Sequence, residues 1–305
     1  WNTIPTAHNA TPDIVLGQPN FISNAAGTTT SSLSTPIGIA YRASQGVYFV
    51  SDSGSNRVLV FNTPLTTGAA AMNVLGQPNF ISNTASTTIS SMSGPMGITF
   101  DETNSRLFVA DNSNNRTLVF TVSGGITNGM NASKVLGQPN FITAALATTI
   151  SSMSSPLNVA YDNVNNRLFV ADGVNNRILA FNVATASITN GMNASSVLGQ
   201  TNFITANPDL TISSISSPVG IAYATSSQRL FIADRDNSRV LGFNLSGGIT
   251  NGMNASNVLG QLDFVTNSAL NPARLFRAYG SSVLTDNGKL FFSDYFDKRI
   301  LIWNP

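Results

Sequence analysis

Few side chains in this 305-residue sequence have the chemistry that catalysis or metal binding needs. There is no cysteine and only one histidine, His8, which excludes a thiolate nucleophile, a zinc–thiolate site and a zinc site built from several histidines of one chain. The serines have no histidine partner other than the remote His8. Carboxylates are also scarce, since Glu102 is the only glutamate. We therefore predict a non-catalytic protein with no metal site and no cofactor.

Two aspartates leave one enzymatic alternative open. Asp101 and Asp162 end the same predicted strand in two copies of a repeat, and carboxylates near the centre of a fold can hold a divalent ion for hydrolase or lyase chemistry. The matching positions in the other copies are Arg42, Ala224 and Leu284. We favour a turn role for both aspartates, because the position is acidic in only two copies.

A more regular pattern is an aspartate that closes an apolar run and is followed five residues later by an arginine. The five pairs are Asp52/Arg57, Asp111/Arg116, Asp172/Arg177, Asp234/Arg239 and Asp294/Arg299. Such a ring of charges could contact a ligand. It could also hold a turn, with each aspartate accepting turn N–H groups and pairing with the arginine that opens the next strand. We predict the structural role, because a ligand on an axis rarely needs five identical contacts.

These pairs belong to a repeat of about sixty residues. A second marker is the tetrapeptide Val-Leu-Gly-Gln, whose glycines are Gly17, Gly76, Gly137, Gly199 and Gly260. A third marker precedes each aspartate by fourteen residues and is held by Gly38, Gly97, Asn158, Gly220 and Gly280. Each unit contains four short runs of β-branched and aromatic residues bounded by Asn, Gly, Ser and Pro, which predict strands. No segment has the apolar period of a helix.

Four strands in each of five units predict an all-β fold, a five-bladed β-propeller of four-stranded blades. We expect a single domain over residues 1–305, with blades at about 36–76, 95–137, 156–199, 218–260, and 278–305 together with 13–17. In this scheme the N-terminal strand Asp13–Gly17 completes the last blade and closes the ring. Such closure removes a sheet edge that would otherwise favour aggregation.

The second unit resembles the NHL repeat. Residues Pro95–Phe120 contain Pro-Met-Gly-Ile-Thr-Phe-Asp and then Arg-Leu-Phe-Val-Ala-Asp-Asn-Ser-Asn-Asn-Arg-Thr-Leu-Val-Phe. The NHL pattern runs Pro-x-Gly-Ile-Ala, a strand ending in Val-Ala-Asp, and Asn-x-Arg before an apolar strand. The likeness covers nearly the whole chain, although Ala278 and polar Ser281 depart from it in the fifth unit. The resemblance implies a propeller, and propellers of this kind bind proteins or RNA, while related propellers include lyases and lactonases.

The composition is poor in charge. Charged residues make up 10% of the chain and the formal net charge is +1, so the sequence lacks the basic face that nucleic-acid binding requires. No apolar run is long enough to span a membrane. A neutral, Asn/Ser/Thr-rich chain without cysteine favours a secreted or cell-surface protein that binds a protein or glycan partner, and it is compatible with self-association.

The loops before each first strand are the most distinctive candidate for binding. They read Thr-Thr-Thr-Ser-Ser-Leu-Ser, Thr-Thr-Ile-Ser-Ser-Met-Ser twice, and Leu-Thr-Ile-Ser-Ser-Ile-Ser, and we expect them to form a hydroxyl-rich collar on one face. They are either packed Ω-like loops or a neutral docking surface. In the second case the candidate contact residues are Ser34, Ser93, Ser154, Ser216 and Asn158.

Three copies of Asn-Ala-Ser are candidate N-glycosylation sites, at Asn131, Asn193 and Asn254. Each lies between the third and fourth strands of its unit, and we expect this segment on the face opposite the collar. The alternative is that the tripeptide is turn chemistry copied with the repeat. Glycosylation would support an extracellular location.

Overall fold

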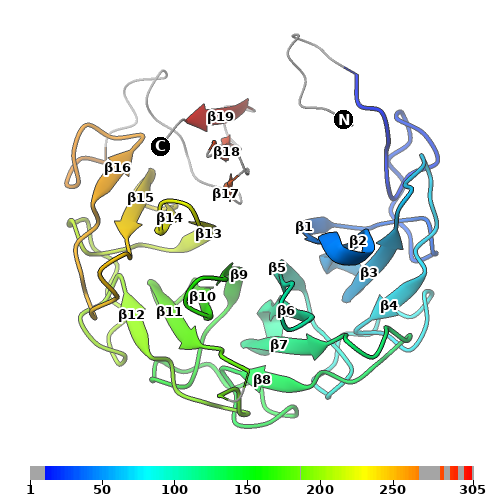
Figure 1. Ribbon diagram of the computed structural model, residues 1–305, viewed down its shortest axis with the longest axis horizontal. Helices are drawn as coiled ribbons and strands as arrows, with labels where there is room; N and C mark the ends of the chain where they lie inside the picture. The colour runs from blue at the N-terminus through cyan, green and yellow to red at the C-terminus, as the bar shows by residue number, and fades with distance from the viewer. Residues whose placement is uncertain (1–10, 186, 268–281, 285–288, 295–298, 304–305) are drawn as a thin grey trace.

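The fold is all-β. The computed structural model describes residues 11–185, 187–267, 282–284, 289–294 and 299–303. These residues form four four-stranded antiparallel sheets and one three-stranded sheet. The sheets are arranged around a common centre, as are the blades of a β-propeller (Figure 1). The helices among the described residues are three short turns, Ala43–Gln45 (η1), Ser53–Ser55 (η2) and Asn112–Asn114 (η3), and none is long and apolar enough to cross a membrane.

Each sheet starts at the centre and adds its strands outward in chain order. The first sheet contains β1 (Pro36–Arg42), β2 (Val47–Asp52), β3 (Arg57–Asn62) and β4 (Asn73–Leu75). The second contains β5 (Pro95–Asp101), β6 (Arg106–Asp111), β7 (Arg116–Thr121) and β8 (Lys134–Leu136). The third contains β9 (Pro156–Asp162), β10 (Arg167–Asp172), β11 (Arg177–Asn182) and β12 (Ser196–Leu198). The fourth contains β13 (Pro218–Ala224), β14 (Arg229–Asp234), β15 (Arg239–Asn244) and β16 (Asn257–Leu259).

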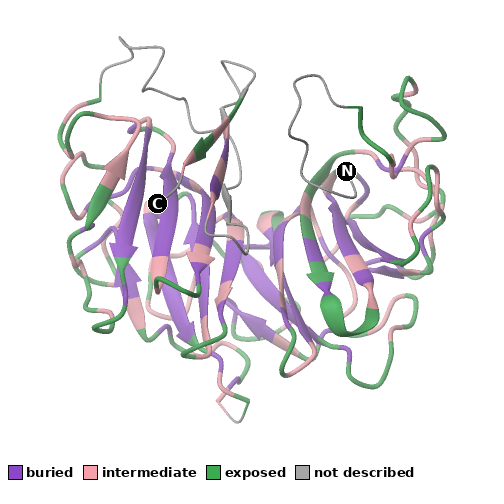
Figure 2. Cartoon of the chain, turned by 45° about the horizontal axis from the view of Figure 1, so that its top comes forward, coloured by how far each residue is buried: buried purple, intermediate pink, exposed green. Residues whose placement is uncertain are grey.

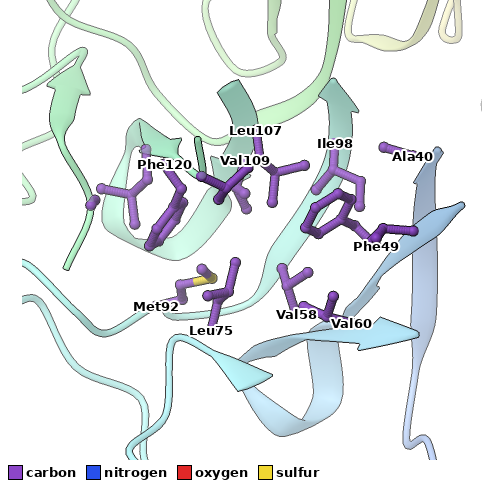
Figure 3. Packing of buried hydrophobic residues seen from close by; sticks show 14 of the residues in the cluster. Ala40, Phe49, Val58, Val60, Leu75, Met92, Ile98, Leu107, Val109 and Phe120 are labelled. Atoms are coloured by element: carbon purple, nitrogen blue, oxygen red, sulfur yellow. The ribbon is translucent and has the colours of Figure 1, made fainter. Parts of the chain in front are cut away.

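The hydrophobic core lies between neighbouring sheets. Figure 3 shows Phe49, Val58 and Leu75 of the first sheet packed against Leu107 and Val109 of the second, and all five side chains are fully buried. Similar apolar clusters lie between the next sheets, so buried residues follow most strands while many exposed residues lie in the loops (Figure 2). The short apolar runs are therefore stabilised mainly by contacts between sheets.

The glycines of the third marker lie where the first strands of adjacent sheets approach each other. A Cβ atom added to Gly38 would lie 2.8 Å from the carbonyl oxygen of Met96, and one added to Gly97 would lie 2.7 Å from the Cα of Asn158. The register of β1 against β2, and of β5 against β6, shifts at the same point, as in a β-bulge. Gly38 and Gly97 therefore leave no room for a side chain at this approach, whereas Asn158 occupies the same position in the third sheet.

The second, third and fourth sheets also hold the outer strand of the sheet before them. Asn128 Oδ1 accepts a hydrogen bond from Val74 N–H at 3.1 Å, and Gly129 N–H donates to Val74 O at 3.0 Å. We call these two bonds the clasp. They recur in the next two sheets, as Asn190 and Gly191 with Val135 and as Asn251 and Gly252 with Val197. The clasp satisfies an edge strand that would otherwise leave its backbone groups unpaired.

The fifth sheet differs from the prediction. Its described strands are β17 (Ser282–Leu284), β18 (Leu290–Asp294) and β19 (Arg299–Trp303), and residues 278–281 of the predicted blade lie outside the described residues. The predicted closing strand Asp13–Gly17 forms no strand, and the described strands leave an arc open between β19 and this segment (Figure 1).

The N-terminal segment is bonded to the first sheet instead. Gly68 N–H donates to Val15 O at 3.0 Å, and Val15 N–H donates to Thr67 Oγ1 at 3.4 Å. These bonds reproduce the clasp, with a threonine hydroxyl in place of the asparagine amide oxygen. The segment therefore has the position of an outer strand relative to the first sheet, without being paired to β19.

Candidate binding face

The aspartate–arginine pairs lie at one end of the sheets, which we call the upper face. It is formed by the turns between second and third strands and by the loops that follow β4, β8, β12 and β16. The Arg Nε to Asp Oδ2 distances are 2.9 Å for Arg57–Asp52, 2.6 Å for Arg116–Asp111, and 2.7 Å for both Arg177–Asp172 and Arg239–Asp234. All four described pairs are fully buried. Asp294 and Arg299 are in register across β18 and β19, but their side chains lie outside what the structure describes.

Each guanidinium group joins three segments of chain. Arg116 pairs with Asp111, donates through Nη1 to the carbonyl oxygen of Phe141, and donates through Nη2 to those of Thr88 and Ser91 at 3.0 and 2.9 Å. The first carbonyl belongs to the loop after the sheet, and the other two belong to the loop before it. With a net positive charge and several donors directed at backbone oxygens, the arginine fixes both loops on its own sheet.

The aspartate carboxylates of the pairs also accept several hydrogen bonds each. Asp172 accepts hydrogen bonds from Ser154 N–H at 2.6 Å and from Asn175 Nδ2 at 2.9 Å, besides its arginine. Burial raises the pKa of Asp172 and of Asp234 to about 6, because the loss of solvent outweighs the adjacent guanidinium and these hydrogen bonds. Burial also raises the pKa of Asp111. The pairs are out of reach of a ligand at the surface.

The collar loops, residues 28–34, 87–93, 148–154 and 210–216, lie on this upper face. Each is closed by a local hydroxyl bond, such as Thr88 N–H to Ser91 Oγ at 2.8 Å. Each is also anchored by one buried apolar side chain, respectively Leu33, Met92, Met153 and Ile215. In three of the loops the exposed hydroxyl residue is a threonine, namely Thr29, Thr88 and Thr149.

The serines predicted as contact residues do not project from the collar. The backbone N–H groups of Ser34, Ser93, Ser154 and Ser216 donate to the aspartates of the pairs at 2.6–2.7 Å. Ser154 and Ser216 are buried, and the other two are half-buried. These serines recur because their backbone attaches each loop to an aspartate of the pairs. The exposed threonines lie elsewhere in the same loops.

Asn158, the fifth candidate, lines a cavity of about 600 Å³ at the centre of the sheets. The walls come mainly from the first strands, with Ile39, Val159 and Val219 among the lining residues, and Arg235 of the fourth sheet also lines the cavity. Asn158 Oδ1 accepts a hydrogen bond from the adjacent Val159 N–H at 2.7 Å. The candidate contact residues are therefore separated, with the serines in the collar loops and the asparagine in the cavity.

The carboxylates considered for a divalent ion lie at the other end of the sheets, the lower face. Asp101 Oδ2 is 2.5 Å from Arg106 Nη2, and Asp162 Oδ2 is 2.7 Å from Arg167 Nε. Asparagine amides at Asn104 and Asn165 also donate to the two aspartates. Within the described part of the chain, no three His, Cys, Asp or Glu side chains gather where a metal could bind. The arrangement is that of two arginine-held turns.

The candidate glycosylation sites are exposed, but their segment follows a different path from the one expected. Ala132, Ala194 and Ala255 follow the three asparagines, and their N–H groups donate to the carbonyl oxygens of Ile89, Ile150 and Ile212 in the collar loops. Our placement of Asn131, Asn193 and Asn254 on the face opposite the collar is therefore wrong. The segment that contains each asparagine runs along the preceding sheet, where it forms the clasp. It therefore lies beside the collar loops.

Sequence reasoning missed one exposed position that recurs in every unit. We call the residues at this position the rim residues. These are Ile22, Ile81, Ile142, Ile204 and Val265. The signal is the tripeptide that follows Val-Leu-Gly-Gln in every unit, Asn-Phe-Ile in four units and Asp-Phe-Val in the fifth, whose aliphatic residue lies in a loop.

No protein-family model matches the sequence, and no curated protein matches it either. Among solved structures, the crystal structure of a nidogen/laminin complex contains a chain that is similar, with a TM-score of 0.48 and 17% sequence identity. The match covers 74% of this chain and 64% of that chain, so this chain spans less than two thirds of the length of the one it matches.

Proposed function

We propose that this protein is a non-catalytic extracellular binding or structural module that presents its neutral upper face to a protein or glycan partner. The observation that carries the proposal is the low charge of that face. The loops at residues 18–35, 77–94, 138–155 and 200–217 together contain a single charged residue, Asp209, while the turn after β14 adds the ion pair Arg235–Asp236 and the loop after β16 adds Asp263. A surface of hydroxyl, amide and aliphatic groups suits a neutral partner, because charged side chains are depleted where protein interfaces are fully buried.

The way these loops are held supports the same proposal. Buried arginines bind the backbone of the loops on both sides of each sheet, so the exposed groups are fixed before a partner arrives. A preorganised surface loses less conformational entropy on binding than mobile loops do. We therefore expect the upper face to bind as a rigid unit.

The test uses an array of neutral polysaccharides, acidic polysaccharides and purified cell-surface proteins. Thr88→Arg with Thr149→Arg places two charges on exposed collar positions, and Thr103→Arg with Val164→Arg places the same charges on exposed lower-face turns of the same two sheets. We expect at least one neutral probe to bind the wild type and the lower-face variant but not the upper-face variant. Binding that survives the upper-face change would contradict the proposal.

A hydrolase or lyase with a divalent ion near Asp101 and Asp162 is the alternative. Both carboxylates are neutralised by arginines at 2.5–2.7 Å, which leaves little affinity for a cation. Metal analysis of the purified protein separates the two functions. A stoichiometric divalent ion that is lost in Asp101→Asn would favour the enzyme.

We also propose a secreted or cell-surface location. The absence of cysteine and the low charge support it, and the exposed Asn131, Asn193 and Asn254 would be accessible to a glycosylating host. Intact-mass measurement on protein from the native source tests this. Extra mass that a glycosidase removes supports the location, and a mass equal to the bare 32.1 kDa chain removes the glycosylation argument.

We further propose that the protein is a five-bladed propeller of the NHL type, closed by Asp13–Gly17. Two observations, one on β19 and one on the N-terminal segment, support closure. Ile300 and Ile302 of β19 are 59% and 55% exposed, whereas Val58 and Val60, at the matching positions of β3, are buried. Leu16 packs on the first sheet in the way that Leu75 packs on the second. Pairing the segment with β19 would cover the exposed isoleucines.

The register of closure follows from the repeat. The valine of Val-Leu-Gly-Gln lies opposite the residue two positions after each arginine, as in Leu59 with Val74 and Leu241 with Val258. Val15 should therefore lie opposite Leu301. Since the chain has no cysteine, Val15→Cys with Leu301→Cys should form a disulfide within the monomer, while Val15→Cys with Ile300→Cys, whose side chains point to opposite faces, should not. Equal cross-linking in both, or cross-linked dimers, would contradict this register.

A further inference from the structure

The cavity at the centre of the sheets has the size and the lining of a small-molecule site. Its volume of about 600 Å³ lies within the range of about 300–1,000 Å³ that holds drug-sized ligands. Four lining residues directly follow the proline that opens a first strand, and all four are apolar: Ile37, Met96, Leu157 and Val219. Ile37 is exposed and the other three are half-buried. The cavity therefore offers aliphatic surface that a ligand would remove from water.

One lining residue departs from the repeat. Asn158 stands where the other four units have glycine, at Gly38, Gly97, Gly220 and Gly280. A Cβ atom added to Gly97 would lie 2.5 Å from Asn158 Oδ1, so the glycine of the neighbouring strand leaves the space that the asparagine side chain occupies. Since four units have no side chain at this position, a unit does not need the amide in order to fold.

The amide of Asn158 is held with its nitrogen available. Its Oδ1 accepts the hydrogen bond from Val159 N–H at 2.7 Å, which fixes the orientation of the group. Its Nδ2 has no hydrogen-bond partner within the described part of the chain. An amide nitrogen can only donate, so a ligand at this point must carry a hydrogen-bond acceptor.

The charges of the cavity favour an uncharged ligand. Among the described lining residues Arg235 is the only charged one, and none has a carboxylate. Its Nε is 2.7 Å from Asp236 Oδ1 and its Nη2 donates to Ser217 Oγ, so its charge is balanced by a neighbour outside the lining. A basic ligand would meet no anion in the cavity, and an acidic ligand would compete with Asp236 for the arginine.

We infer that the central cavity binds a small uncharged molecule, mostly apolar, that presents one acceptor such as a ketone or ester oxygen to Asn158 Nδ2. The apolar lining supplies the driving force, and the amide sets the orientation of the ligand. This site goes beyond the proposed function and does not rest on it, because the exposed threonines of the collar do not line the cavity.

The test compares benzophenone with diphenylmethane, two ligands that share both phenyl rings and differ in the carbonyl oxygen. We expect one benzophenone to bind per chain, about five- to tenfold more tightly than diphenylmethane in an NMR titration, because only the ketone accepts the amide hydrogen bond. In Asn158→Gly this difference should disappear. That variant should keep the circular dichroism and Tm of the wild type, because glycine stands at this position in the other units.

A matched pair of variants isolates the donor. Asn158→Asp keeps an acceptor for Val159 N–H but replaces the amide nitrogen with an oxygen, and it should weaken benzophenone binding at least about fivefold. Asn140→Asp adds the same charge in a loop outside the cavity and should leave binding unchanged. Its turn should persist, because Asp263 makes the same turn in the fifth unit.

Irradiation locates the ligand, since the excited ketone takes hydrogen from a nearby C–H group and the two carbons then join. Mass spectrometry should place the adduct on Met96 or Leu157. No saturable binding, equal affinities of the two ligands for the wild type, an unchanged affinity in Asn158→Asp, or adducts confined to the rim residues would overturn the site. Diphenylacetate that binds more tightly than benzophenone would overturn the uncharged class.

The two proposals fail separately. Thr88→Arg with Thr149→Arg should leave benzophenone binding unchanged, and Asn158→Gly should leave binding of the array probes unchanged. Loss of benzophenone binding in the threonine variant would contradict a separate central site.

Discussion

The upper and lower ends of the sheets carry aspartate–arginine pairs with the same spacing but different surroundings. At the upper face Arg177 is fully buried and bonds Asp172 and three backbone carbonyl oxygens in two loops. At the lower face Arg167 is 13% exposed, bonds Asp162 in its own turn, and lies over the ring of Phe169. The upper pair joins separate loops to a sheet, whereas the lower pair closes a single turn.

The comparison shows that spacing in the sequence determines which charged side chains form a pair. The contribution of a pair to stability depends on how many chain segments its side chains bind. A buried pair with its hydrogen bonds complete becomes costly only when one partner is removed, because the other is then left in a dry site. A pair at the edge of solvent can replace a lost partner with water. The following changes test how far the two ends differ.

The largest expected effect comes from Arg177→Met. It leaves Asp172 buried without its cation and removes the donors to the carbonyl oxygens of Phe203, Thr149 and Ser152. We expect the free energy of unfolding to fall by about 3–5 kcal/mol, measured by denaturant titration. Arg177→Lys restores the charge but not the fork of donors, and it should recover only part of the loss. A full recovery would show that charge alone matters.

The pH dependence of stability should come next. The folded pKa of Asp172 and Asp234, about 6, lies above the ordinary value of 3.8, so between these values the folded protein holds protons that the unfolded chain has released. The contribution of these groups to stability therefore rises as the pH falls through 6 towards 4. Asp172→Asn removes one titrating group, and Tm measured across this range should rise less on acidification than in the wild type. Parallel curves would contradict the shift.

A smaller effect is expected at the lower face. Asp162→Ala removes bonds to Val164 N–H, Asn165 and Arg167, but the arginine can reach solvent. We expect a loss of about 1–2 kcal/mol in the free energy of unfolding. A loss as large as that of Arg177→Met would remove the distinction between the two ends.

The smallest effect is expected at Glu102, beside the lower pair of the second sheet. Its carboxylate accepts hydrogen bonds from the Ala43 and Ser44 N–H groups of the first sheet at 3.0 Å. Its slight burial would raise its pKa, but these bonds and nearby Arg42 outweigh that effect and lower it. Glu102→Gln keeps an acceptor and should change stability by less than about 0.5 kcal/mol, because the site is exposed. A larger change in Tm would show that charge also links sheets at this end.

The sequence was sufficient for the features that depend on local spacing. The strands follow from short apolar runs between turn residues, and the contact of Asp111 with Arg116 follows from their places across a tight turn. The close approach that requires Gly38 could not be located from spacing, since it depends on how adjacent sheets meet.

The candidate site was harder to predict, because exposure and path depend on distant contacts. Ser154 and Ser216 lie in hydroxyl-rich loops, yet their backbone bonds to aspartates place them inside. The path of Asn131 is set by the clasp with the preceding sheet, and nothing in its own hairpin reveals that direction. Ile81 was overlooked because an aliphatic residue in a strand-rich sequence is expected to be buried.

The clasp has a consequence for synthesis of the chain on the ribosome. The side-chain bonds of the clasp join residues 54 or 55 positions apart, and in each case the later residue completes the earlier strand. An emerging sheet therefore keeps one open edge until most of the next unit has left the exit tunnel. As translation proceeds, this edge passes from each unit to the next, so the growing chain exposes one new edge at a time.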